Sequence, residues 1–172
     1  MTFHEANLGT VVQSPGSGKS LCIHVGVDAD SGLVHTVVGT AANVNDVTQA
    51  SALVHGEERD VFADAGYQGV GKREETQGIK ANWHVAMRPG KRRVLDKATP
   101  VGRVLDELEH VKACIRAKVE HPFRVIKRQF GFVKVRYRGL AKNTAQVLTL
   151  FALSNLWMAR RHLLTNAGEV RL

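Results

Sequence analysis

The sequence predicts an α/β fold in which a mixed β-sheet is flanked by helices. Residues 21–38 alternate apolar and polar positions on either side of a turn rich in Asp, Ser and Gly, which is typical of a β-hairpin. Short apolar runs at 59–63 and 82–87 indicate two further strands. Long stretches with helical spacing follow at 101–130 and 143–164. Strands followed by helices of this kind favour a layered α/β domain.

The first half of the chain alternates strands with short helices. In the hairpin, Ile23, Val25 and Val27 share one face, and residues 28–32 (Asp-Ala-Asp-Ser-Gly) form the turn. A helix should follow, with Asn45 or Asp46 as its N-cap. Residues 70–79 are polar and predict a short helix that ends near Gly78.

The second half is dominated by helices. A basic linker at 91–100 leads into the 101–130 pattern, which Pro122 should interrupt. The last helix should begin with Asn143 or Thr144 as its cap. Apolar residues cover most of its surface, so we expect it to be buried against the sheet, with Trp157 in the core.

Residues 1–20 differ from the rest, and we expect them to be a divergent, disordered N-terminus ahead of a domain over 21–172. The segment SPGSGKS is rich in small and breaker residues. It looks like a phosphate-binding loop, but the GxxxxGK[ST] spacing needs a glycine at position 13, where the chain has Gln13. Nucleotide binding is therefore not predicted.

Composition and charge point to a polyanionic partner. The 172 residues carry a net charge of +8. Residues 111–142 alone contain ten Lys or Arg and one acid, Glu120, and such clusters favour nucleic acid over a solvated basic face. No apolar run could span a membrane and no secretory signal is visible, so we expect a cytoplasmic protein. Cys22 and Cys114 are too few for a Cys-rich metal site, and we expect both to be buried.

The stretch VFADAGYQG places Asp64 at the end of an apolar strand, before a glycine turn. A carboxylate at a sheet edge with open backbone beside it suits a magnesium ligand in phosphoryl transfer. An Asp followed by Ala-Gly-Tyr also suits a simple turn cap. The sequence favours neither over the other.

Glu120 lies inside the basic segment, with Arg116 four residues before it and Arg124 four residues after it. On one continuous helix these side chains, with Lys127, would share a face. A ladder of surface ion pairs explains one Glu between two arginines. It does not explain the other cations, which suit a metal ligand surrounded by phosphate-binding groups.

These motifs resemble the bacterial insertion-sequence DDE transposases of the four/five group. The resemblance rests on ADAGYQG, on Arg116, Glu120 and Lys127 in an R-x3-E-x6-K arrangement, and on several longer segments between residue 24 and about residue 164. Those segments are GVDADSGLVH, TAANVNDVTQA, NWHVAMRPGKRR, VEHPFRVIKRQFG, KVRYRGLAKNTAQ and LFALSNLWMARR. One position of the signature differs, because Ala113 stands where the family has Tyr.

The resemblance implies a ribonuclease-H-like core that cuts and joins DNA with Mg²⁺ or Mn²⁺. It implies that Asp64 and Glu120 are catalytic metal ligands. Arg116 and Lys127 match the family's signature, and with Arg124 and Arg128 they should bind the DNA of element ends and target. A homo-oligomer or a full-length transposase is a further expected partner.

The resemblance fades before His24. The family's first catalytic Asp lies on a strand ahead of the hairpin, whereas the only acid before Asp28 is Glu5. We therefore expect an N-terminally truncated core that lacks the first strand and exposes the edges of its neighbours, and that is defective alone. Asp28 and Asp30 fit turn chemistry better than a replacement ligand, and Asp46 fits an N-cap. A non-catalytic DNA-binding remnant or regulator is the alternative function.

Overall fold

The computed structural model describes residues 5–13 and 21–167. Within these residues, five strands form one sheet in the order β3-β2-β1-β4-β5. The strands are β1 (Glu5–Gln13), β2 (Leu21–Asp28), β3 (Val34–Ala41), β4 (Asp60–Ala63) and β5 (Asn82–Val85). β1 pairs antiparallel with β2 and parallel with β4, while β3 and β5 form the edges. The mixed sheet confirms the predicted α/β class.

The expectation that the first strand is missing is wrong. β1 lies between β2 and β4 at the centre of the sheet, so residues 5–13 are not disordered, and the edges that its absence would expose are paired. The sequence EANLGTVVQ reads poorly as a strand because Asn and Gly disfavour extended structure. Central placement overrides this weak propensity, since both edges of β1 pair and Ala6 and Leu8 are fully buried. The SPGSGKS segment lies outside the described residues.

Short helices and turns cover one face of the sheet. They are η1 (Asp46–Gln49), α1 (Ala50–Leu53), η2 (Ala65–Tyr67), η3 (Val70–Lys72) and η4 (Glu74–Thr76). Leu53, Tyr67 and Val70 pack there against Leu8 and Val61. The single helix expected over 70–79 is two 3₁₀ turns instead, and Asn45, not Asp46, stands at the N-cap position of η1.

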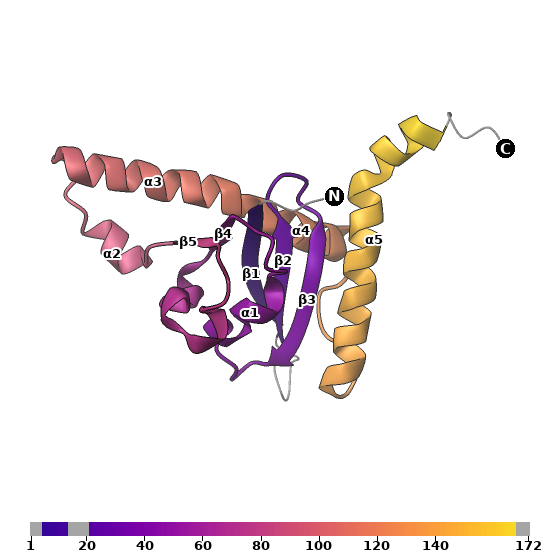
Figure 1. Ribbon diagram of the computed structural model, residues 1–172. Helices are drawn as coiled ribbons and strands as arrows, with labels where there is room; N and C mark the ends of the chain where they lie inside the picture. The colour runs from indigo at the N-terminus through magenta and orange to yellow at the C-terminus, as the bar shows by residue number, and fades with distance from the viewer. Residues whose placement is uncertain (1–4, 14–20, 168–172) are drawn as a thin grey trace.

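The helices of the second half of the chain cover the other face of the sheet and cross one end of it (Figure 1). They are α2 (Pro89–Arg93), α3 (Pro100–Arg116), η5 (Ala117–Val119), α4 (Glu120–Arg128) and α5 (Leu140–Ala167). Ile23, Val25 and Val27 of β2 contact Phe123 of α4 and Phe151 of α5 in this second core. Figure 1 shows α3 crossing the end of the sheet and extending beyond it with α2.

The helix break is not at Pro122. The α-helical pattern stops at Arg116, and the 3₁₀ turn η5 separates α3 from α4. Pro122 is the third residue of α4, in the first turn, where its missing N–H removes no helical hydrogen bond. Arg116 and Arg124 therefore lie on two different helices, so the one continuous helix on which the shared face was expected is interrupted between them.

α5 packs along the edge strand β3 by one face only (Figure 1). Asn155 fixes this contact, because its amide accepts a hydrogen bond from Val34 N (2.9 Å) and donates one to Val34 O (2.7 Å). The helix does pack against the sheet, but the expectation that Trp157 lies in the core is wrong: Leu148, Leu156 and Trp157 are 55%, 59% and 38% exposed. The helix begins at Leu140, so Asn143 is not its N-cap but bonds back to Tyr137 and Gly139.

Candidate functional site

Asp64 follows β4 directly, at the carboxyl end of a strand that β1 and β5 flank. It is half-buried. Its Oδ1 accepts a hydrogen bond from Gly66 N at 2.8 Å, so Asp64 does cap the η2 turn. Its second oxygen makes no hydrogen bond within the described part of the chain. The capping role and a ligand role are therefore compatible, because each uses a different oxygen.

A second carboxylate, Asp46, lies beside Asp64. A Cβ built on Gly66 would stand 2.6 Å from Asp46 Oδ2 and 3.0 Å from Asp64 Oδ1, so the two acids approach the same glycine. Asp46 is the first residue of η1, after the N-cap residue Asn45. Burial raises the pKa of Asp46; His24 opposes that shift and the charge of Asp64 adds to it. Of the two expected N-cap residues, the structure has Asn45, so the assignment of Asp46 as an N-cap is wrong.

Two buried side chains of β2 complete this cluster. Cys22 and His24 are two residues apart and therefore share a face of the strand, and they are 2% and 0% exposed. His24 Nδ1 lies 3.8 Å from Asp46 Oδ1, and His24 Nε2 lies 2.9 Å from Thr40 Oγ1. Burial lowers the pKa of His24 and raises that of Cys22, and the charge of Asp46 raises both. Alternation along β2 could have paired Cys22 with His24, but no sequence signal links them to Asp46.

Glu120 is not part of this cluster. It is the first residue of α4 and is exposed. Lys118, just before it, donates to the carbonyl oxygens of Ala29 (2.5 Å) and Asp30 (3.3 Å) and so holds η5 against the β2–β3 turn. Within the described residues, no hydrogen bond or ion pair joins Glu120 to Asp64.

The β2–β3 turn behaves as its sequence predicts. Asp28 Oδ1 accepts from both Ser31 N (2.6 Å) and Ser31 Oγ (2.5 Å), and Gly32 has a φ of 72°, which favours glycine. Asp28 also pairs in register with Ala6, two residues before Leu8, the partner of Ala63 on β1. Asp28 is therefore a turn residue.

β1 supplies no acid next to Asp64. Asp64 comes directly after the Leu8–Ala63 pair, and residues 6–13 contain neither Asp nor Glu. Glu5 pairs in register with Asp60, at the opposite end of β4. The central strand beside β4 is thus present, but its position next to Asp64 is not acidic.

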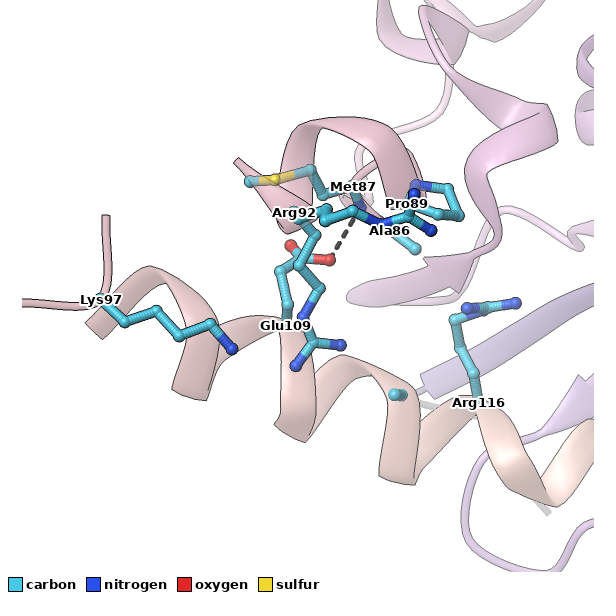
Figure 2. Close-up of a pocket in the computed structure, with 9 residues that line it drawn as sticks. Ala86, Met87, Pro89, Arg92, Lys97, Glu109 and Arg116 are labelled. Atoms are coloured by element: carbon cyan, nitrogen blue, oxygen red, sulfur yellow. Dashed lines mark hydrogen bonds between the residues drawn. The ribbon is translucent and has the colours of Figure 1, made fainter. Parts of the chain in front are cut away.

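A cationic pocket opens beside the segment that follows β5 (Figure 2). Ala86, which lines the pocket, donates its backbone N–H to Ala63 O at 2.9 Å, one residue before Asp64. The pocket encloses about 490 Å³ and draws four cations from α2, the following loop and α3: Arg92, Arg93, Lys97 and Arg116. Arg116 Nε is buried and has no hydrogen-bond partner within the described residues. The pocket therefore offers positive charge that an anion could neutralise.

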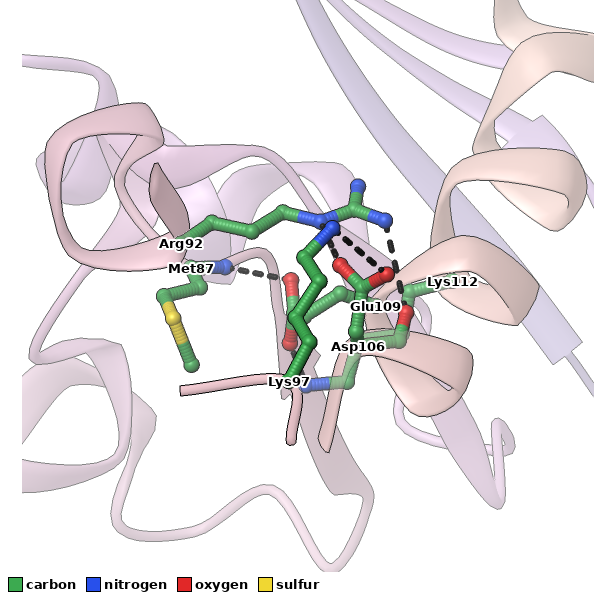
Figure 3. Close-up of polar contacts among 6 residues, drawn as sticks. All are labelled: Met87, Arg92, Lys97, Asp106, Glu109 and Lys112. Atoms are coloured by element: carbon green, nitrogen blue, oxygen red, sulfur yellow. Dashed lines mark hydrogen bonds and ion pairs between the residues drawn. The ribbon is translucent and has the colours of Figure 1, made fainter. Parts of the chain in front are cut away.

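Two acids anchor one wall of this pocket (Figure 3). Asp106 binds Arg92 (2.8 Å) and Lys97 (3.0 Å), whose hydrogen bonds lower its pKa. The buried Glu109 accepts from Met87 N at 2.7 Å and from Lys112 Nζ at 2.8 Å. Burial raises the pKa of Glu109, but these donors outweigh it and hold the pKa low.

These contacts fix the loop after β5 to α3 and leave Arg93 and Arg116 without an ion pair in the described chain. Sequence reasoning took residues 91–100 for a linker. Nothing in the sequence indicates that Arg92, Arg93 and Lys97 line the same pocket as Arg116.

The other predicted DNA-binding residues lie on α4. Arg124, Lys127 and Arg128 are all exposed. Arg124 lines a separate groove between α4 and α5, together with Arg160, which stacks over the Trp157 ring at 4.3 Å. Arg116 thus lines the pocket that Ala86 borders, and Arg124 lines a second cationic groove.

Comparison with protein families identifies the chain. The model of the Transposase DDE domain matches residues 11–156, which is most of the sequence. The chain belongs to the transposase DDE domain family. The match supports the insertion-sequence DDE transposase expected from the motifs, with DNA as the partner and a divalent metal as the general cofactor of the family. Among the described residues of this transposase, no helix has the length and apolar character needed to cross a bilayer.

Proposed function

We propose that this chain is the catalytic core of an insertion-sequence transposase of the four/five group, that it binds DNA phosphates beside Asp64, and that it is defective in catalysis on its own. The observation that carries the proposal is the cationic pocket beside the segment that follows β5. The strand order, with β1 antiparallel to β2 and parallel to β4, supports a ribonuclease-H-like core. The reaction would be Mg²⁺-dependent strand cleavage followed by strand transfer.

The charges around the pocket suit a DNA backbone. Arg116 projects into it from α3, and Arg93 comes from α2, so a phosphate could be held from two sides. Guanidinium groups bind phosphate oxygens in pairs, which fixes orientation as well as affinity. A phosphate held here would lie next to the strand end where Asp64 offers its second oxygen. The exposed Arg124, Lys127 and Arg128 would bind phosphates farther along the duplex.

The carboxylates fit a metal site only in part. Asp64 and Glu120 are the proposed ligands, and Mn²⁺ could replace Mg²⁺. Magnesium, when bound, would activate the attacking oxygen and neutralise charge at phosphorus. The chain's own part is to hold the ion through Asp64 and to orient the phosphate through Arg116. Because β1 has no acid beside Asp64, we expect weak metal binding and almost no cleavage.

A non-catalytic role is the second candidate, and the same missing acid favours it. A chain that grips DNA without cutting it could occupy element ends or join an active transposase. Binding without chemistry predicts a steep loss of affinity as salt rises, because each phosphate contact releases condensed counterions.

The two roles separate in one pair of assays. Cleavage and strand transfer are measured on supercoiled plasmid with Mg²⁺ or Mn²⁺, and DNA affinity is measured against salt concentration. Arg116→Gln should weaken binding and reduce the salt slope by about 1. Arg73→Gln is the matched control, since Arg73 is paired with Glu75 away from the pocket.

Cleavage that Asp64→Asn abolishes would show that another acid replaces the missing one and that the chain is an active transposase. DNA binding without cleavage supports the defective core. Absence of salt-sensitive DNA binding, or an unchanged slope in Arg116→Gln, contradicts the proposed phosphate site.

A further inference from the structure

We propose that Cys22, His24 and Asp46 form a binding site for a divalent transition-metal ion of the zinc class, separate from the magnesium chemistry expected at Asp64. The three side chains come from β2 and from the start of η1, and each offers a different kind of ligand atom: a sulfur, a ring nitrogen and a carboxylate oxygen. This proposal does not depend on the proposed function, because it concerns other residues and another class of ion.

The spacing of the three ligand atoms is already close to that of a bound site. All of them lie within 4.8 Å of one another, and His24 Nδ1 is 3.8 Å from Asp46 Oδ1. In a tetrahedral zinc site with bonds of about 2.0–2.3 Å, neighbouring ligand atoms are roughly 3.3–3.8 Å apart. Small side-chain rotations would therefore close the site, without movement of β2.

His24 is held as a metal-binding histidine usually is. Its Nε2 is 2.9 Å from the hydroxyl of Thr40, on the neighbouring strand β3, while Nδ1 faces Asp46. If Nε2–H donates to Thr40 Oγ1, Nδ1 carries the lone pair and points at the place where the ion would lie. Metal-binding histidines commonly donate their other ring N–H to an oxygen in this way, which fixes the tautomer and the ring orientation.

The ligand set selects the class of ion. Magnesium prefers oxygen ligands and retains water, whereas a thiolate with an imidazole suits zinc and its neighbours. Cys22 and His24 are fully enclosed, and Asp46 is 28% exposed, so the ion would enter past Asp46. The group offers three ligand atoms, which leaves the fourth position to water.

The test uses Co²⁺ as a spectroscopic probe on the full chain. Titration should give one Co²⁺ per chain with a sulfur-to-cobalt charge-transfer band in the near ultraviolet, and Zn²⁺ should remove that band by displacement. Cys22→Ser should abolish the band. Asp46→Asn and Thr40→Val should each weaken Co²⁺ affinity at least about tenfold.

Two controls keep the outcome specific. Cys114 is exposed and lies 3.7 Å from His110 Nε2, so it is the other thiol that could bind cobalt. Cys114→Ser and Asp64→Asn should leave the band intact. Absence of the band, its loss in Cys114→Ser, or its persistence in Cys22→Ser overturns the proposal.

Folding of the variants is checked by circular dichroism. If Cys22→Ser fails to fold, Asp46→Asn decides, because its side chain is partly exposed and keeps its shape. An affinity in Asp46→Asn equal to that of the unaltered chain contradicts the site. Because plasmid cleavage is not used, failure here and failure of the proposed transposase activity can be told apart.

Discussion

Loss of the contact that Asn155 makes should lower the free energy of unfolding measurably. It sits on α5 and gives the edge strand β3 both the donor and the acceptor that a further strand would have supplied, through Val34 N and Val34 O. Val34 is 8% exposed, so water cannot replace a lost partner easily. The substitution Asn155→Asp keeps the acceptor and replaces the donating amide with a carboxylate oxygen that faces the Val34 carbonyl.

The expected cost follows from these two bonds. Leaving one buried carbonyl without a donor costs about 1–3 kcal/mol, and an ionised carboxylate facing it adds repulsion. We expect Asn155→Asp to lower the free energy of unfolding by about 2–4 kcal/mol at pH 7, out of a total of about 5–15 kcal/mol. Below the pKa of the new carboxyl group its O–H can donate again, so the loss should shrink as the pH falls.

Urea unfolding at pH 7 and at pH 4 measures both effects. Asn45→Asp is the matched control, because Asn45 is exposed and its side chain makes no capping bond. A loss below about 0.5 kcal/mol at pH 7, which is the range of an ordinary surface substitution, would refute the reasoning. So would a loss that does not change with pH, since the donor argument requires that change.

Three further predictions concern other regions. Gly66→Ala should displace the Asp64 carboxylate, whose Oδ1 would lie 3.0 Å from the added Cβ, and so weaken Mn²⁺ binding, measured by calorimetry, whereas Gly78→Ala, with open space around it, should not. Burial, with the charge of a neighbouring histidine, lowers the pKa of His35 to about 4 from 6.5. The neutral His35 ring therefore destabilises nothing above about pH 6.5, whereas below that pH protonation of the unfolded chain lowers the free energy of unfolding, down to about pH 4. The free energy of unfolding of His35→Gln should change less over this pH range than that of the unaltered chain, by up to about 2–3 kcal/mol, as measured by urea titrations. Glu109→Gln should cost about 2–4 kcal/mol and raise the proteolysis of the loop at Met87, because it leaves a half-buried lysine without its partner; equal cleavage rates in both proteins would contradict this.

Most strands could be predicted because their patterns are local. The hairpin, the 60–63 strand and the 82–85 strand each show alternation or a short apolar run bounded by turn residues, and each appears within three residues of its expected limits. β1 could not, because Asn7 and Gly9 weaken its local pattern and its stability comes from pairing on both sides. Propensity reports on a segment alone, whereas a central strand is stabilised by its neighbours.

The residues of the candidate site also differ in how well the sequence could predict them. Asp64 was predictable, since a single strand and turn carry it. Its neighbourhood was not, because Asp46 reaches the end of β4 from an element before it, and Arg116 reaches the pocket after β5 from a helix well after it in the chain. The helix break at Ala117 also separated Arg116 from Arg124, although their spacing suggested a common face. Spacing predicts a shared face only where the helix is continuous.

The position of β1 has a consequence for how the domain folds. Its pairing with β4 joins Glu5 to Asp60, so this part of the sheet closes a far longer stretch of chain than either hairpin does. Contacts that are distant in sequence form late, because loop closure costs entropy before the contact rewards it. The two hairpins can form first, and β4 with Asp64 docks last. A chain whose β1–β4 pairing is loosened should therefore keep most of its sheet while Asp64 becomes mobile, and hydrogen exchange at Phe62 and Ala63 would detect that state before any change in overall unfolding.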